Sequence, residues 1–125
     1  MTIAQQLKIK EFPFIIKDSK GKAIYYETHK YWRKSEYDSH GNEIYHENAN
    51  GYWNKREYDS TGNQIYFEDS NGYWEKHEYD SKSNRIYYET SDGYIEDKRP
   101  KTEVQKAIEL LTKEGLIVDG KILKQ

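Results

Sequence analysis

The chain has 125 residues, which is enough for one domain or one repeat array, and its formal net charge is -2. Ile, Leu, Val and Phe together number only 22, too few for a large aliphatic core, and the mean hydropathy is -1.20. The 13 Tyr and three Trp argue against plain disorder. No apolar run approaches the roughly 20 residues that cross a bilayer, no signal peptide is evident, and cysteine is absent. We therefore expect a cytoplasmic protein that is not embedded in a membrane.

Residues 1–17 precede the repetitive part of the chain and differ from it in composition. The segment TIAQQLKI predicts a short helix, and the apolar segment FPFII predicts a strand after it. We expect residues 1–17 to form an N-terminal cap, because an array of repeats needs atypical ends to cover its open edges.

Residues 18–100 contain four copies of a 21-residue repeat, the first of which lacks one residue. Each copy opens with Asp-Ser and has Ile-Tyr six residues after the Asp. The copies begin at Asp18, Asp38, Asp59 and Asp80. Trp32, Trp53 and Trp74 share one position of the repeat, which Ile95 occupies in the fourth copy.

Turn signals alternate with strand signals inside each repeat. The tetrapeptides DSHG, NANG, DSTG and DSNG fit type I turns that end in a left-handed glycine, and they are spaced 10 or 11 residues apart. The segments between them are rich in aromatic residues and have the length of one strand. The spacing predicts turns near 39–41, 49–51, 60–62, 70–72 and 91–93, with about eight antiparallel strands over 18–99. Ser83 replaces the turn glycine in the fourth copy, so we expect fraying or bending there.

Only five aliphatic residues (Ile, Leu or Val) lie within residues 18–100, too few for two packed layers. We therefore predict a mainly β fold, an antiparallel β-hairpin meander in the form of a thin sheet, a ribbon or a β-solenoid. Aromatic ladders and cross-strand Lys–Glu pairs would stabilise it.

Residues 101–125 return to an ordinary composition. The pair Thr102 and Gln105 reads as a capping box and predicts a helix over 102–114, whose apolar positions Val104, Ile108 and Leu111 would pack on the array or on a second chain. The segment LIVDGKIL predicts a hairpin on an Asp119-Gly120 turn. We expect this helix and hairpin to form the C-terminal cap.

The segments EYDSHGNEIY and GYWNKREYDSTGNQIY resemble the YD repeats of the RHS family, in which Tyr-Asp is followed by a Gly three residues later with a period near 21. The resemblance covers about 83 residues, and the spacing recurs at Tyr37 and Tyr58. It implies a β-hairpin array of bacterial or bacteriophage type. The shell around a toxin that large RHS proteins form does not carry over, because four copies cannot enclose cargo. The GYW elements are also similar to the choline-binding repeats of cell-wall proteins.

Catalytic and metal chemistry is not indicated by the sequence. Carboxylates recur by symmetry in every copy, so no copy has a unique acid, base or nucleophile, and we expect no enzyme and no cofactor. The four histidines lie at four different repeat positions, which predicts no metal site. Residues 18–100 have 12 Lys or Arg against 17 Asp or Glu, so direct binding of nucleic acid is not expected.

Two functions fit this sequence. The first is a protein-binding module, with a phage-encoded inhibitor of a host defence protein as one form of it. The second is a pocket protein for choline or a sugar. A third possibility is an array in which the rings only stabilise the sheet. A homo-oligomer is a separate possibility for its assembly. Exposed contiguous rings would favour a site, whereas rings covered by Lys and Glu stems would favour a structural role. The candidate binding residues are Tyr31, Trp32, Tyr52, Trp53, Tyr73 and Trp74, and we expect the last four to lie side by side on one face.

Overall fold

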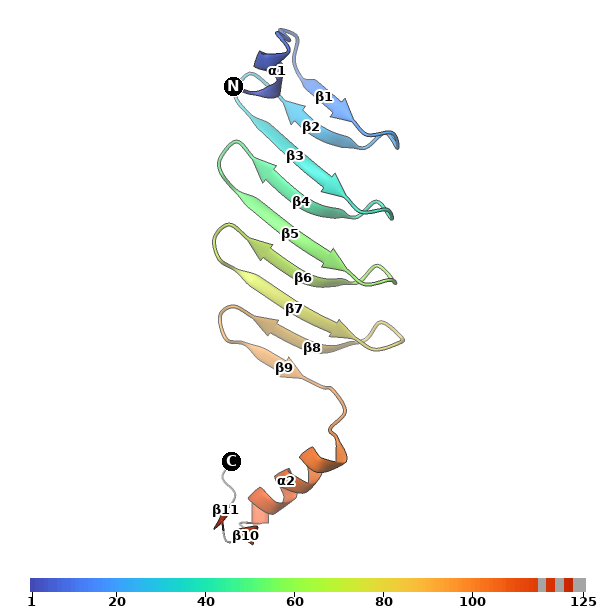
Figure 1. Cartoon of the computed structure of the whole chain (residues 1–125), viewed down its shortest axis with the longest axis vertical. Helices are drawn as coiled ribbons and strands as arrows, with labels where there is room; N and C mark the ends of the chain where they lie inside the picture. The colour runs from blue at the N-terminus through green and yellow to red at the C-terminus, as the bar shows by residue number, and fades with distance from the viewer. Residues whose placement is uncertain (115–116, 119–120, 123–125) are drawn as a thin grey trace.

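The computed structural model of the protein describes residues 1–114, 117–118 and 121–122. It is a nine-stranded antiparallel sheet in a single open layer, and each strand pairs with its neighbours in sequence (Figure 1). The strands of this sheet are β1 (Phe14–Lys17), β2 (Ala23–Glu27), β3 (Trp32–Tyr37), β4 (Glu43–Asn48), β5 (Trp53–Tyr58), β6 (Gln64–Asp69), β7 (Trp74–Tyr79), β8 (Arg85–Thr90) and β9 (Ile95–Asp97). The remaining elements are α1 (Ile3–Gln6), α2 (Glu103–Glu114), β10 (Ile117–Val118) and β11 (Lys121–Ile122).

The predicted mainly β meander is confirmed, and of its three forms the thin open sheet is the right one. Eight strands lie between residues 23 and 97, and all five predicted turns are present at the expected positions. The hairpins stack along the longest axis of the molecule in Figure 1 like the rungs of a ladder. No helix in the described part of the chain is both long and apolar enough to span a membrane.

An aspartate closes each turn at the start of a repeat. At Asp59, Oδ1 accepts hydrogen bonds from the backbone N–H groups of Thr61 (3.0 Å) and Asn63 (2.9 Å), while Gly62 N donates to Asp59 O (3.1 Å). The pKa of the Asp59 carboxyl is lowered, chiefly by the bond from the Asn63 backbone. The same bonds form at Asp38 and Asp80, so the Asp and Gly of the repeat are explained by turn chemistry.

The turn at Ser83 does not fray or bend the sheet, so that expectation is wrong. Ser83 adopts φ +64, the left-handed conformation that glycine takes in the other copies, and its N–H donates to Asp80 O (3.0 Å) as the glycines do. The Ser83 hydroxyl also accepts a hydrogen bond from the Asn63 side chain (3.0 Å). Strand β8 keeps five paired positions with β7.

At the strand ends opposite the aspartate-closed turns, a second set of loops links successive hairpins. Ser70 N donates to the carbonyl of Trp53 (2.9 Å), and Trp53 N donates to the Ser70 hydroxyl (3.2 Å). Ser91 and Trp74 repeat both bonds. Each Trp therefore has its backbone fixed by the loop that follows the next strand.

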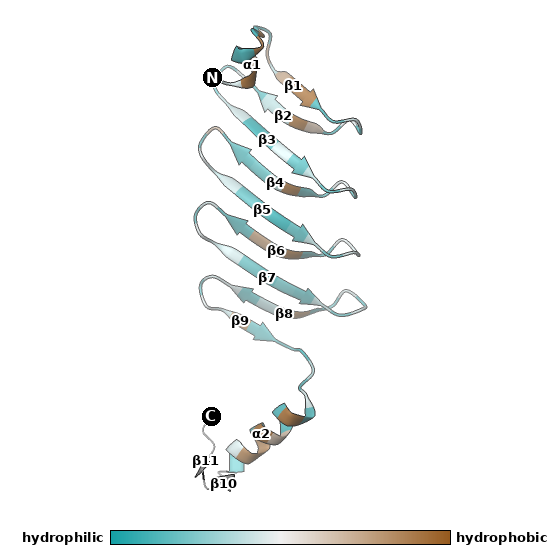
Figure 2. Ribbon diagram, in the orientation of Figure 1, coloured by the Kyte–Doolittle hydropathy of each residue, from teal (hydrophilic) through white to brown (hydrophobic). Residues whose placement is uncertain are grey.

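The sheet has almost no conventional core. No large side chain in the described part of the chain is fully buried, and the only buried hydrophobic residues there are Ala4 and Tyr25. Figure 2 shows strands that are mostly hydrophilic, with the more hydrophobic segments in β1, α1 and α2. Both faces of the central sheet are therefore in contact with solvent.

Helix α1 covers one face of the first strands, as the predicted N-terminal cap requires. Glu27 on β2 is only 4% exposed. Its carboxylate accepts hydrogen bonds from the Thr2 hydroxyl (2.7 Å), the Ala4 backbone (3.2 Å) and the Tyr25 hydroxyl (2.8 Å). Burial raises the pKa of Glu27, but the bonds from Thr2, Tyr25 and Ala4 outweigh it, so the pKa is lowered overall. The burial and the bond to Glu27 raise the pKa of Tyr25 to about 12.

The C-terminal segment forms its predicted elements but does not act as a cap in the described residues. Thr102 N donates to Gln105 Oε1 (2.8 Å) and Gln105 N donates to Thr102 Oγ1 (3.0 Å), which confirms the capping box at the start of α2. The expected packing of its apolar positions on the array is wrong, because α2 buries no residue and Val104 is 67% exposed, while packing on a second chain stays a prediction. The chain leaves the sheet after β9 and places α2 beyond the last strand (Figure 1). Strands β10 and β11 pair as predicted, while the Asp119-Gly120 turn lies outside the described residues.

Substitution of the turn glycine should distinguish backbone strain from steric crowding. Gly62 has φ +89, and a Cβ added to it would meet no atom within 4 Å, so strain alone should decide the outcome. Gly62→Ala should lower the free energy of unfolding by about 1–2 kcal/mol, and Gly62→Asn by less, since Asn tolerates the left-handed conformation better. Thermal unfolding of the three proteins tests this order. If Gly62→Asn lowered the free energy of unfolding more than Gly62→Ala, steric crowding and not the positive φ would be the cause.

Substitution of Glu27 should reveal its pKa through the pH dependence of stability. At pH 7, Glu27→Gln should lower the free energy of unfolding by about 1–3 kcal/mol, because a buried hydrogen-bonded carboxylate is lost. A carboxyl group with a lowered pKa in the folded state stabilises it above the ordinary pKa of 4.5, and this contribution disappears as the pH falls through the folded-state value. The difference in melting temperature between wild type and variant should therefore be largest above pH 4.5 and disappear as the pH falls below it, through the folded-state pKa of Glu27.

The matched control is Glu47→Gln, at the same position of the next repeat. The Glu47 side chain is more exposed and has no α1 above it, so its loss should be smaller. Equal losses from the two variants would contradict the anchoring of α1 by Glu27.

Candidate interaction surface

Alternation of side chains along each strand divides the array into two faces of different character. Residues i and i+2 of a strand point to the same face, and cross-strand pairs join residues on the same face. Trp53 lies opposite Glu47, and Lys55 lies opposite both Tyr45 and Glu68. Trp, Lys, Tyr and Glu of successive strands therefore share one face.

This first face is nearly the same in every copy of the repeat, and we name it the constant face. Odd strands contribute Trp, Lys and Glu, and even strands contribute Tyr and Glu. Its members are Tyr25, Glu27, Trp32, Lys34, Glu36, Tyr45, Glu47, Trp53, Lys55, Glu57, Tyr66, Glu68, Trp74, Lys76, Glu78, Tyr87 and Glu89.

The side chains of the constant face satisfy one another. On each even strand the Tyr hydroxyl donates to the Glu two residues later, at distances from 2.8 Å (Tyr87 to Glu89) to 3.4 Å (Tyr45 to Glu47). Lys34 Nζ lies 2.9 Å from a carboxylate oxygen of Glu47, which is the largest reason that the pKa of Lys34 is raised. Different residues of neighbouring strands thus contact one another, and the same set of contacts recurs from copy to copy as a ladder.

The opposite face differs from copy to copy, and we name it the variable face. Its central positions hold a different set of residues in each repeat. The four variable positions are Tyr26, His46, Phe67 and Tyr88; Thr28, Asn48, Asp69 and Thr90; Arg33, Asn54, Glu75 and Glu96; and Ser35, Arg56, His77 and Lys98. Such differences arise where the fold does not dictate the residue, so this face is free to specialise.

The variable face has its own internal contacts around Glu75. One Glu75 oxygen accepts a hydrogen bond from the Tyr73 hydroxyl (2.7 Å), and the other lies 3.0 Å from His77 Nε2. Burial raises the pKa of Glu75, but the hydrogen bonds from His77 and Tyr73 lower it overall. The His77 ring lies 4.9 Å from the Tyr88 ring.

Three polar atoms of the variable face are buried without a hydrogen-bond partner among the described residues. They are Asn54 Oδ1, Arg56 Nε and His77 Nδ1, and Asn54 is only 6% exposed. No such atom occurs on the constant face in the part of the chain that the structure describes. Native proteins leave few buried polar groups unsatisfied, so the side chains of the variable face satisfy one another less completely than those of the constant face.

The structure divides the residues predicted as a binding site between the two faces. Trp32, Trp53 and Trp74 lie on the constant face, whereas Tyr31, Tyr52 and Tyr73 precede them by one residue and lie on the other side. The Tyr52 ring is 6.5 Å from His46, and the Tyr73 ring is 6.3 Å from Phe67. The expectation of side-by-side rings on one face is wrong.

The tryptophans are also separated from one another and covered. Equivalent residues lie two strands apart, at least about 9.5 Å, and Glu68 on β6 lies opposite Trp74. Lys55 Nζ lies 5.3 Å from the centre of the Trp53 ring, and Lys76 Nζ lies 5.0 Å from that of Trp74. Rings covered by lysine stems favour a structural role for Trp53 and Trp74.

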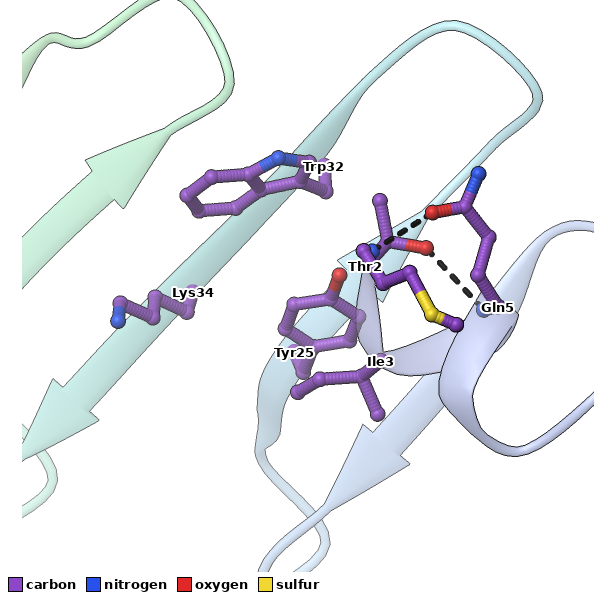
Figure 3. A pocket seen from close by; sticks show the side chains of 7 residues that line it. Thr2, Ile3, Gln5, Tyr25, Trp32 and Lys34 are labelled. Carbon is purple, nitrogen blue, oxygen red and sulfur yellow. Dashed lines mark hydrogen bonds between the residues drawn. The ribbon is translucent and has the colours of Figure 1, made fainter.

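An open hollow of about 370 Å³ lies between α1 and β3, on the constant face (Figure 3). Its lining includes Thr2, Gln5, Tyr25, Trp32 and Lys34. The Trp32 and Tyr25 rings stack with centres 6.3 Å apart. A cation such as choline would meet the Lys34 ammonium here, so this hollow argues against the choline-like alternative and leaves a sugar ring as the better fit.

The sequence analysis missed the residues of the variable face, although a signal for them was available. A column-by-column comparison of the four repeats separates constant from variable positions without any structure.

Within the described residues, no group of three or more His, Asp or Glu side chains is arranged to hold a metal ion.

No protein-family model matches the chain, and no curated protein matches it either. The resemblance to the YD repeats of the RHS family stays a prediction.

Replacement of the repeated tryptophans should show whether they stabilise the sheet. Trp53→Ala and Trp74→Ala should each lower the free energy of unfolding by about 2 kcal/mol, less than for a fully buried Trp, because the indoles are only half-buried. The control is Ile95→Ala, at the same repeat position but 57% exposed, which should change the stability by less than about 0.5 kcal/mol. Thermal unfolding measures all three, and unchanged melting of both Trp variants would contradict the structural role.

Proposed function

We propose that this chain is a non-enzymatic protein-binding repeat protein and that the variable face is its recognition surface. The observation that supports this most directly is the difference between the faces. One face repeats the same Trp, Lys, Tyr and Glu positions, with a Tyr–Glu hydrogen bond on every even strand, while the other has copy-specific side chains and all the unpartnered buried polar atoms found in the described residues. A surface of this kind offers a distinct pattern of groups to one partner.

The shape of the array supports the same proposal. A rigid, extended sheet has little ordering entropy to lose on binding, and extended surfaces are how repeat proteins bind large partners. The aromatic rings at the rims of the variable face, such as Tyr52, Tyr73 and Tyr94, are residues of the type enriched at binding hot spots. The inhibition of a defence protein in a bacterial host is one form of this function that stays a prediction.

An exchange of residues between two repeats tests this proposal without a change in composition or charge. The segments Asn54-Lys55-Arg56 and Glu75-Lys76-His77 occupy the same repeat positions. The variant N54E/R56H/E75N/H77R exchanges them, keeps both lysines of the constant face and preserves the Glu–His pairing at a new place. Because Asn54 is only 6% exposed and lies opposite Asp69, the new Glu at position 54 should lower the melting temperature. Binding is therefore measured at a temperature at which thermal unfolding shows the variant to be folded, and the folded variant should lose the captured partner.

The experiment captures proteins from bacterial cytosol on the tagged chain, identifies them by mass spectrometry and then measures each purified candidate against both proteins. The control is Lys55→Gln on the constant face, which should leave the binding unchanged. A partner held equally well by the exchanged variant would show that the variable face is not the recognition surface.

A further inference from the structure

Three arginines lie over aromatic rings of the variable face, and a register shift next to Arg85 brings its side chain to the Tyr88 ring on that face. Arg33, Arg56 and Arg85 lie against the aromatic rings of Tyr26, Phe67 and Tyr88, with the guanidinium carbon 4.4, 5.4 and 4.2 Å from the ring centres. None of the three forms an ion pair with another described residue. On the constant face Lys34 pairs with Glu47 and Arg99 pairs with Asp97 and Glu78, whereas Lys55 and Lys76 lie over Trp rings without an ion pair to any described residue. The three arginines differ from these two lysines in offering a planar guanidinium with several N–H donors.

We propose that these arginines bind carboxylates of an acidic segment of the protein partner. This inference rests on the proposed function and names the chemistry of the partner. A guanidinium has five N–H donors in one plane, and two of them can form hydrogen bonds to one carboxylate while the ring lies against the guanidinium. The stacking also holds the side chain in place, so less side-chain entropy is lost when the carboxylate binds.

The arrangement of the arginines suits an extended segment. Arg33 on β3 pairs with Asn48 on β4. The Asn48 N–H donates to Tyr52 O (3.0 Å), just before β5 begins, and Arg56 follows Tyr52 by four residues. Arg33 and Arg56 are therefore two strands apart and displaced along the strand direction, a separation of roughly 16 Å. An extended chain covers this distance in about five residues. Arg33 and Arg85 are exposed, and Arg56 has a buried, unpartnered Nε.

Charge favours an acidic protein segment over a nucleic acid as the occupant. The repeats have 17 acidic residues against 12 basic ones, and Asp69, Glu75 and Glu96 lie on the same face as the arginines. A nucleic acid places a phosphate at every nucleotide and would meet these carboxylates, because its charge is continuous. A protein segment can place its carboxylates only opposite the arginines.

The test measures binding of two labelled probes to the full chain by fluorescence anisotropy. The first probe is a peptide of alternating glutamate and serine, and the second is single-stranded oligo-deoxythymidine. The variant R33Q/R56Q/R85Q removes the three guanidinium groups, and K34Q/K55Q/K76Q makes the same change in net charge on the constant face. We expect the peptide to bind the wild type, the arginine variant to weaken this binding at least about tenfold, and the lysine variant to change it less than about threefold.

Several outcomes would overturn the inference. They are equal losses from the two variants, no binding of the peptide, or tighter binding of the oligonucleotide than of the peptide. The variant R33K/R56K/R85K keeps the charge but not the two-pronged geometry, and full binding by it would show that only charge matters. If the triple arginine variant does not fold, the exposed Arg33→Gln and Arg85→Gln variants replace it.

The same variants separate this inference from the proposed function. If the exchanged variant N54E/R56H/E75N/H77R loses the captured partner while R33Q/R56Q/R85Q keeps it, the variable face is the recognition surface but the acidic ligand is wrong. If both keep the partner, both proposals are wrong.

Discussion

Cross-strand contacts within one layer are what the rest of this structure depends on. A sheet usually buries at least one face against another layer, and the hydrophobic effect then supplies most of its stability. Here both faces meet solvent, and no large side chain among the described residues is fully buried. Stability must come from in-plane hydrogen bonding, aspartate-closed turns and a ladder of Trp, Lys, Tyr and Glu in which every rung contacts the next. This requirement explains why those residues recur in every copy.

The difference between the two faces follows from the same dependence on cross-strand contacts within one layer. The ladder needs only one face to be uniform, because a strand is held by its neighbours and not by a second layer. The residues on the opposite face can then differ between repeats at little cost to the fold, as Ser35, Arg56 and His77 do at one position. A single-layer repeat protein can therefore separate the residues that stabilise it from the residues that recognise a partner.

Local rules account for most of what the sequence predicted about the fold. Turns, strand lengths and the meander follow from Asp, Gly and aromatic spacing, because each hairpin is specified within about 20 residues. Register was not predictable in the same way. Ile65 lies unpaired between the partners of Glu57 and Tyr58 and shifts the register of β5 and β6. The β1–β2, β3–β4 and β7–β8 pairs have a similar shift, and β6 lies between the Trp53 and Trp74 rings. The lack of packing by α2 was equally beyond the sequence, since an amphipathic pattern shows that a helix has an apolar face but not what covers it.

The placement of the arginines joins the stability of the sheet to its recognition chemistry. In a sheet with a covered face, an unpaired guanidinium would be buried at high cost. In this single layer it stays at the surface, and the ring beside it supplies a cation–π contact in place of a carboxylate. The same contact that stabilises the hairpin therefore leaves the hydrogen-bonding edge of the arginine open. Because each hairpin is held by its neighbours alone, such a group can be gained or lost in one repeat without disturbing the others, which is how four similar copies can present four different surfaces.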